Sequence, residues 1–110
     1  MIKVSFFQDN GRTYKVRAIG HSGYAESGSD IVCAAVSTLV QTAYLAIKDL
    51  GANVEFKRDE DRALFEFRIE RETDIDHDIQ VIIRALRVGA EDLRSGYPQF
   101  ITTETITGGK

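Results

Sequence analysis

The segment "DIVCAAVSTLVQTAYLAIKDLG" (residues 30–51) is apolar around most of its circumference if it forms a helix. Asp30 is a typical helix N-cap, and Gly51 is typical of the position just beyond a helix C-terminus. Two apolar stripes run along it: Ile31, Ala35, Leu39, Thr42 and Ala46, and Val36, Val40, Ala43 and Ile47. Such a helix must be covered on more than one side, so we expect a sheet on one side and a second helix or another subunit on the other.

Alternating apolar and polar residues predict strands on both sides of this helix. Residues 2–19 are expected to form a hairpin, because "DNG" at residues 9–11 is a strong turn signal. A second hairpin is predicted over residues 53–70 around "DED", and a last strand over residues 99–107. The residues expected to share the core face are Ile2, Val4 and Phe6, Tyr14, Val16 and Ala18, and Phe65, Phe67 and Ile69.

A second helix is predicted to begin near "TDID" (residues 73–76), where Thr73 and Asp76 have the spacing of a capping box. Gly96 and Pro98 end it. Its apolar stripe contains Ile75, Ile79, Ile82, Leu86, Gly89 or Ala90, and Leu93. The order is therefore β-β-α-β-β-α-β. We predict one α+β domain over residues 1–110, with a mixed sheet of about five strands and two helices packed on one face.

The composition limits the possible functions. The chain of 110 residues has 14 basic and 17 acidic side chains and a net charge of -3, which argues against broad nucleic-acid binding. A single cysteine precludes an internal disulfide and suits a reducing compartment. The opening "MIKVSFFQDN" lacks the pattern of a signal peptide, and no apolar run approaches the roughly 18 residues of a membrane span. We therefore expect a cytoplasmic protein without a membrane partner.

The segment "GHSGYAESGSDIVCAA" (residues 20–35) places His21 and Cys33 at the two ends of a glycine- and serine-rich loop. With Asp30 as N-cap, Cys33 falls in the first helical turn, where unpaired N–H groups and the helix dipole favour a thiolate. If the loop ends meet, His21 can deprotonate Cys33 and later protonate a leaving amine. Asp30 either caps the helix or orients the imidazole. Ser37, on the same helix face, can donate a hydrogen bond near the thiol or bind substrate.

Other interpretations of these residues stay open. A free cysteine is often a small buried hydrophobe, and one Cys with one His leaves zinc short of ligands even with Asp30. Gly20, Gly23 and Gly28 match neither common phosphate-binding glycine pattern. We therefore expect no metal and no cofactor. A thiol redox sensor would lack a resolving cysteine.

Residues 20–37, "GHSGYAESGSDIVCAAVS", closely resemble the signature of the bacterial ribosomal-processing cysteine protease (Prp) family. The resemblance extends over almost the whole chain, to the "YP" before the last strand. It implies a catalytic dyad of His21 and Cys33, with Asp30 and Ser37 in supporting roles. It also implies a homodimer, and a substrate: the N-terminal extension of a large-subunit ribosomal protein, the twenty-seventh, cut after an aromatic pair next to a basic tail.

The resemblance suggests further roles around the loop. Gly20, Gly23 and Gly28 are candidate hinges that let an extended peptide enter. Backbone N–H groups at the helix start are candidate donors to an oxyanion. Tyr24 and Tyr44 are candidates to line a pocket for the aromatic pair.

Two serines depart from the family pattern: Ser22 stands where alanine is frequent, and Ser27 where a larger residue is common. We expect neither to touch the chemistry, although Ser27 can change the contacts of the loop with substrate. The alternative function is a non-enzymatic ribosome-associated assembly factor, whose loop docks onto RNA or protein. The missing basic patch and the Cys/His pair favour the enzyme.

Two charged groups receive structural interpretations. "DIDHD" (residues 74–78) gathers three carboxylates and a histidine, and a metal site there is possible in principle. Acidic residues are common at a helix N-terminus because they complement its dipole, so we favour that role. Arg84, Arg87 and Arg94 are expected to form a solvated face of the second helix.

Overall fold

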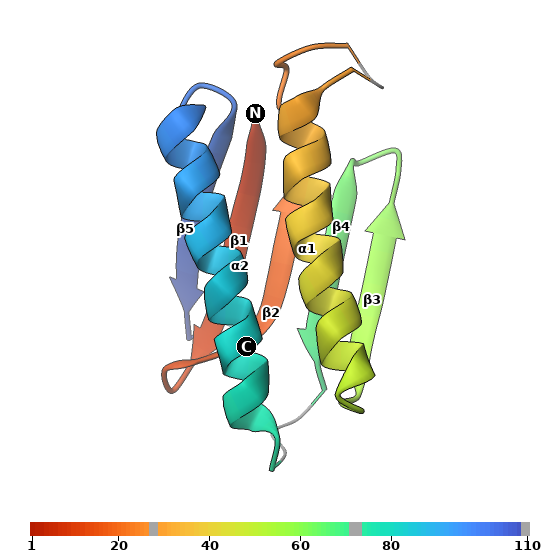
Figure 1. Ribbon diagram of the computed structural model, residues 1–110, viewed down its shortest axis with the longest axis vertical. Helices are drawn as coiled ribbons and strands as arrows, with labels where there is room; N and C mark the ends of the chain where they lie inside the picture. The colour runs from red at the N-terminus through yellow and green to blue at the C-terminus, as the bar shows by residue number, and fades with distance from the viewer. Residues whose placement is uncertain (27–28, 71–73, 109–110) are drawn as a thin grey trace.

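The computed structural model describes residues 1–26, 29–70 and 74–108, and within them it contains five strands and two helices (Figure 1). The chain runs through β1 (Ile2–Asp9), β2 (Arg12–Ile19), α1 (Ile31–Asp49), β3 (Val54–Asp59), β4 (Leu64–Ile69), α2 (Asp76–Gly96) and β5 (Ile101–Thr107). The predicted order of elements is confirmed. Most boundaries fall within two residues of the expected ones.

The strands form one mixed sheet in the order β3-β4-β2-β1-β5. Both hairpins are antiparallel, β2 and β4 are also antiparallel, and β1 pairs in parallel with β5. Both helices lie on the same face of this sheet (Figure 1). The other face carries charged pairs such as Arg17 and Glu66, whose Nε and Oε1 atoms are 2.7 Å apart. The predicted α+β architecture is therefore confirmed.

The core lies between the sheet and the two helices. The sheet contributes Val4, Phe6, Val16 and Phe67 to this core. The buried residues of α1 are Val32, Val36, Val40, Ala43 and Ile47, and those of α2 are Ile79, Ile83, Leu86 and Ala90. The sheet thus covers one side of α1, as predicted. In α2, Ile83 is buried, whereas Ile82, which was predicted to belong to the apolar stripe, is only partly buried.

The stripe of α1 that contains Leu39 meets α2. A Cβ atom on Gly89 would lie 3.0 Å from Leu39 Cδ2, so the missing side chain lets the two helices approach closely. The third side of α1 remains exposed. By length and composition α1 would suffice to cross a membrane, which the sequence analysis did not expect. Its buried stripe packs on the sheet, which is the arrangement of a core helix.

Tyr14 differs from its predicted position. The register of β1 and β2 shifts between Phe7 and Gln8, which leaves Tyr14 as an extra residue in β2. Such a bulge redirects a side chain. Tyr14 is buried, but its ring packs against Phe7, 6.5 Å between centroids, beneath the guanidinium of Arg68. It does not belong to the core cluster with Val16 and Ala18.

The start of α2 also differs from the capping-box expectation. Ile75 is the N-cap and makes no side-chain capping hydrogen bond; Thr73 lies outside the described residues. Asp76 in the first turn is bound by Arg12, with 2.8 Å between Oδ1 and Nε. In the described part of the chain, no group of three or more His, Cys, Asp or Glu side chains is arranged to hold a metal ion.

Gly20 turns the chain from the end of β2 into the loop. Its N–H donates to Ala63 O at 3.0 Å, and its φ is +101°. A Cβ atom there would lie 2.5 Å from the carbonyl oxygen of Met1. Both the backbone conformation and the space therefore require glycine immediately before His21.

We predict that Gly20→Ala destabilises the fold more than Gly51→Ala does. Gly51 has a similar φ, +92°, but nothing lies within 4 Å of its Cβ position. The positive φ alone costs about 1–2 kcal/mol in each variant, and only Gly20→Ala adds the contact with Met1. Urea unfolding of both variants measures the difference. Equal losses of unfolding free energy would show that the Met1 contact relaxes without cost.

Candidate active site

Cys33 lies in the first turn of α1, three residues after the helix N-cap. Asp30 is that N-cap, as predicted: its Oδ1 accepts from the N–H groups of Val32 at 3.0 Å and Cys33 at 2.9 Å. The Ala34 N–H donates to Asp30 O at 3.1 Å. Three of the N–H groups predicted as oxyanion donors are therefore already used by Asp30.

The second oxygen of Asp30 holds the loop. Asp30 Oδ2 accepts from the hydroxyl of Ser22 and from the N–H of Ala25 at 3.3 Å. Ser22 Oγ in turn accepts from the Tyr24 N–H at 3.1 Å. Ser22 and Asp30 are both buried. Of the two roles open to Asp30, the structure uses the carboxylate to cap the helix and fasten the loop.

This network keeps Asp30 ionised. Partial burial raises the pKa of Asp30, but the hydrogen bonds from Ser22 and from three backbone N–H groups outweigh that effect and lower the pKa to about 2. The pKa in the unfolded chain is about 3.9. The ionised carboxylate therefore stabilises the fold above about pH 4, and this contribution is lost as the pH falls toward 2.

The thiol receives a hydrogen bond from the same loop. The N–H of Ser22 donates to Cys33 Sγ at 3.4 Å, and the sulfur is partly buried. Ser22 follows His21 in the chain, so this bond holds the backbone next to the histidine against the cysteine. An N–H donor and a helix N-terminus both favour negative charge on sulfur. The expectation that Ser22 does not touch the chemistry stays a prediction, but its backbone contacts the sulfur and its hydroxyl contacts Asp30.

His21, Cys33 and Ser37 line two adjoining cavities. One has a volume of about 550 Å³ and is otherwise lined by Gly23, Ala25, Asp30 and Ala34. The other, about 390 Å³, extends from the same three side chains toward β4 and the β3–β4 turn. The loop end and the helix start therefore meet at one cleft, as the dyad hypothesis requires.

The second cavity contains residues that the sequence analysis did not connect with the site. Arg58 and Asp59 line it from the end of β3, Glu60 from the β3–β4 turn, and Leu64 and Phe65 from β4. β2 pairs with β4 up to the contact of Ile19 with Leu64, which brings this turn beside the end of β2. The charged "DED" segment was the only sequence signal, and its proximity to His21 depends on the sheet order.

The described residues that line these two cavities do not include the candidate tyrosines, Tyr24 and Tyr44. Tyr24 packs edge-on against Tyr97 and Phe100, with centroids 5.6 and 5.3 Å away, and so anchors the loop to the end of α2. Tyr44 stacks near Phe56 at 4.8 Å, farther along α1. Gly23 lines the larger cavity with a φ of +77°. Gly28 and Ser27 lie outside the described residues.

A cysteine at a helix N-terminus, with a histidine in the same cleft, is an arrangement typical of thiol-dependent hydrolases. The model of the cysteine protease Prp family matches residues 1–102, and the chain belongs to this family. It is therefore a cysteine protease. No curated protein gives a significant match.

Solved structures agree with this assignment. The crystal structure of SMU.848 from Streptococcus mutans is 32% identical, covers 97% of this chain and 95% of its own, and has a TM-score of 0.83. The essential ribosomal processing protease Prp from S. aureus, with a covalently linked product peptide, is 27% identical with a TM-score of 0.83 over 96% and 99% of the chains. The same protease with a substrate peptide is 25% identical, with a TM-score of 0.80 over the same shares.

Replacing Ser22 with alanine removes the side-chain hydrogen bond that lowers the pKa of Asp30, so that pKa should rise toward its ordinary value. We expect Ser22→Ala to be less stable than the parent chain near pH 6. The difference should shrink as the pH falls to about 2, because the parent chain then loses the same interaction. Urea unfolding across this pH range measures it.

Ser29→Ala is the matched control, because Ser29 is an exposed serine of the same loop. It should unfold like the parent chain at every pH. A stability difference for Ser22→Ala that stays constant from neutral to acid pH would contradict the link between the hydroxyl and the carboxylate.

Proposed function

We propose that this cysteine protease is an endopeptidase that removes a short N-terminal extension from a large-subunit ribosomal protein, the twenty-seventh. The observation that carries the proposal is that Cys33, at the N-terminus of α1, shares its cleft with His21. The S. aureus relatives, described as a ribosomal processing protease with substrate and product peptides, support the substrate class. Family membership also favours an enzyme over the non-enzymatic assembly factor.

In the proposed mechanism, His21 accepts the proton of the Cys33 thiol. The thiolate sulfur forms a bond to the scissile carbonyl carbon. The C–N bond then breaks, and the imidazolium gives its proton to the leaving amine, which releases the C-terminal part of the substrate. A water molecule next attacks the thioester, with His21 accepting one of its protons. The carboxylate product leaves as the proton returns to Cys33.

The oxyanion formed in each step needs N–H donors close to the sulfur. The N–H groups of Val32 and Cys33 are committed to Asp30. The N–H of Ser22 points at Cys33 Sγ and is next to the reacting atom, so we assign it as a donor to the oxyanion. Ser37, one turn after Cys33 and on the wall of the same cleft, is placed to contact the bound peptide.

The second cavity suits the proposed cleavage sequence. Its apolar wall contains Ala18, Leu64 and Phe65, which can receive an aromatic side chain. Asp59 and Glu60 border the same cavity and can attract a basic tail beyond the cut. These residues replace Tyr44 as candidates for the substrate pocket.

The proposed activity predicts cleavage of a precursor peptide that carries an aromatic pair before the cut. Cys33→Ala should lower kcat/KM by about three orders of magnitude or more, and His21→Ala by about 10²–10⁴-fold. Mass spectrometry of the products measures both the rate and the position of the cut.

His77→Ala is the control, because His77 is the other histidine of the chain and is exposed on α2. It should cleave like the parent chain. Full activity of Cys33→Ala or His21→Ala would sink the proposed dyad. Cleavage that ignores the aromatic pair would refute the proposed specificity.

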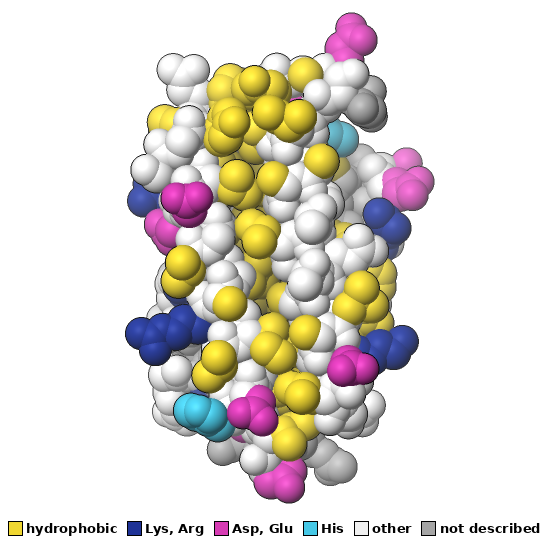
Figure 2. Space-filling view, viewed as in Figure 1, with side chains coloured by type: hydrophobic (Ala, Val, Ile, Leu, Met, Phe, Trp, Pro, Cys, Tyr) yellow, Lys and Arg dark blue, Asp and Glu magenta, His cyan; other side chains and the backbone are white. Residues whose placement is uncertain are grey.

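The exposed side of α1 supports the proposal of a homodimer. Ile31 and Leu45 are 55% and 54% exposed, and no charged residue occurs in α1 before Lys48. Apolar side chains run along this helical face, with charged ones mainly toward its edges and ends (Figure 2). An uncharged helix face can pack against its own symmetry copy without burying an unpaired charge. Together with the single free cysteine, this suits a cytoplasmic homodimer.

The dimer predicts a concentration-dependent mass near twice 12.3 kDa in sedimentation equilibrium. Leu45→Glu should shift the chain to monomer, because it places a charge in the contact. Asn53→Glu adds the same charge at an exposed loop position and should leave the dimer intact. A parent chain that stays monomeric at high micromolar concentration would refute the dimer.

A further inference from the structure

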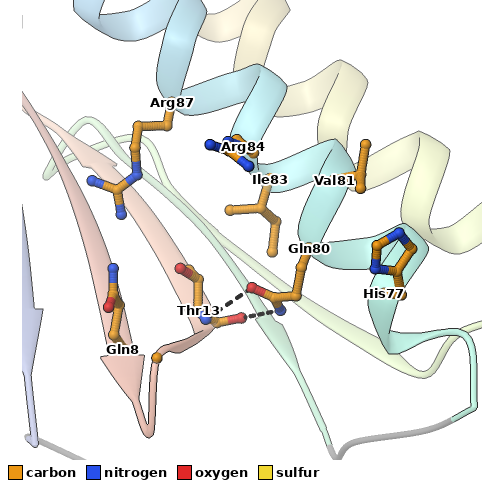
Figure 3. A pocket seen from close by; sticks show the side chains of 9 residues that line it. Gln8, Thr13, His77, Gln80, Val81, Ile83, Arg84 and Arg87 are labelled. Carbon is orange, nitrogen blue, oxygen red and sulfur yellow. Dashed lines mark hydrogen bonds between the residues drawn. The ribbon is translucent and has the colours of Figure 1, made fainter.

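A third cavity, of about 380 Å³, lies between α2 and the β1–β2 hairpin (Figure 3). Its lining includes Gln8, Thr13, Gln80, Ile83, Arg84 and Arg87. It is located at the opposite end of β2 from His21, roughly 26 Å away at about 3.3 Å per residue. It is therefore separate from the peptide cleft.

The cavity is positively charged. Arg84 and Arg87 are three residues apart on α2, and both side chains extend on the same side of the helix (Figure 3). Among the described residues that line it, none is acidic. Asp76, in the first turn of α2, is already bound by Arg12 at 2.8 Å. A local charge of this sign stands out in a chain whose net charge is -3.

Arg87 is held in place but only partly satisfied, in contrast to the solvated role expected from the sequence. Its Nη1 donates to Thr105 Oγ1 at 2.7 Å, and its guanidinium lies 4.2 Å from the centroid of the Phe6 ring. Its Nη2 is buried and has no hydrogen-bond acceptor in the described part of the chain. A buried donor without an acceptor is costly. An acceptor oxygen in the cavity reaches this donor when the Arg87 side chain shifts, because the atom is closed to solvent as it stands.

The floor of the cavity is rigid. The side-chain amide of Gln80 accepts from the Thr13 N–H at 3.0 Å and donates to the Thr13 carbonyl at 2.9 Å (Figure 3). This pair of bonds fixes the hairpin to α2 and keeps the cavity formed without a ligand. A preformed site loses little conformational freedom on binding.

We propose that this cavity binds a phosphate group, with Arg84 and Arg87 as its ligands. Guanidinium groups offer planar pairs of N–H donors that match phosphate oxygens, and two of them balance the charge of a phosphate dianion. Arg87 supplies the inner guanidinium, and Arg84, which is exposed, closes over the ligand from the solvent side. A free phosphate and a phosphate of RNA share this chemistry.

The test is a titration of the full chain with inorganic phosphate at constant ionic strength, followed by ¹H–¹⁵N NMR. Saturable shifts are expected at Thr13, Gln80 and the arginine side chains. Arg84→Gln should weaken phosphate binding by about tenfold or more. Arg87→Gln should weaken phosphate binding to a similar extent. If Arg87→Gln perturbs the fold because Arg87 no longer contacts Phe6, Arg84→Gln still decides the test, because Arg84 is exposed.

Arg94→Gln is the matched control, because Arg94 lies on the same helix but is paired with Glu91, at 3.2 Å, outside the cavity. It should bind phosphate like the parent chain.

A second titration uses a short single-stranded RNA. Tighter binding of RNA at the same residues identifies a nucleic-acid phosphate as the ligand. Binding of inorganic phosphate alone identifies free phosphate as the ligand. Shifts that do not saturate, or equal affinity in all three variants, would overturn the proposal.

Discussion

The hydrogen bonds accepted by the Asp30 carboxylate are the interaction on which the cleft with His21 and Cys33 depends. One oxygen caps α1 and the other binds Ser22 and the backbone of Ala25, so a single side chain fixes both the helix start and the loop. The loop is otherwise attached by Gly20 at the sheet and by Tyr24 at the end of α2. The ionised Asp30 carboxylate is therefore one of three contacts that hold the loop and place His21 and Cys33 at the same cleft.

Backbone groups provide much of the polarity around the sulfur. The Ser22 N–H donates to Cys33 Sγ, and Cys33 lies in the first turn of α1. Backbone dipoles of this kind are fixed by the fold and need little reorganisation when charge develops. The Asp30 carboxylate adds a negative charge at the start of α1. Its hydrogen bonds to Ser22 and to backbone N–H groups hold that charge in a fixed position. A rigid fold can thus surround a sulfur atom with polar backbone groups while using few charged side chains.

Local patterns in the sequence predicted the elements well, because caps and periodicity act over a few residues. Asp30, Gly51 and the buried stripe of α1 are where these rules place them. Features that depend on contacts between distant segments were missed. The bulge that turns Tyr14 to the other face, and the approach of Glu60 to the site, both follow from strand pairing. The contacts of Ser22 with Asp30 and Cys33 were not predicted, because the sequence does not show that Ser22 is buried beside Asp30.

The parallel pairing of β1 with β5 joins the two ends of the chain. Ser5 donates a hydrogen bond to Glu104 at 2.6 Å, across 99 positions of sequence, and the fully buried Ile101 completes the core beside Ile2. Contacts of such long range slow folding. During synthesis, one edge of β1 remains unpaired until β5 has left the ribosome, and open edges invite aggregation. The topology therefore delays the complete sheet until β5 has been synthesised.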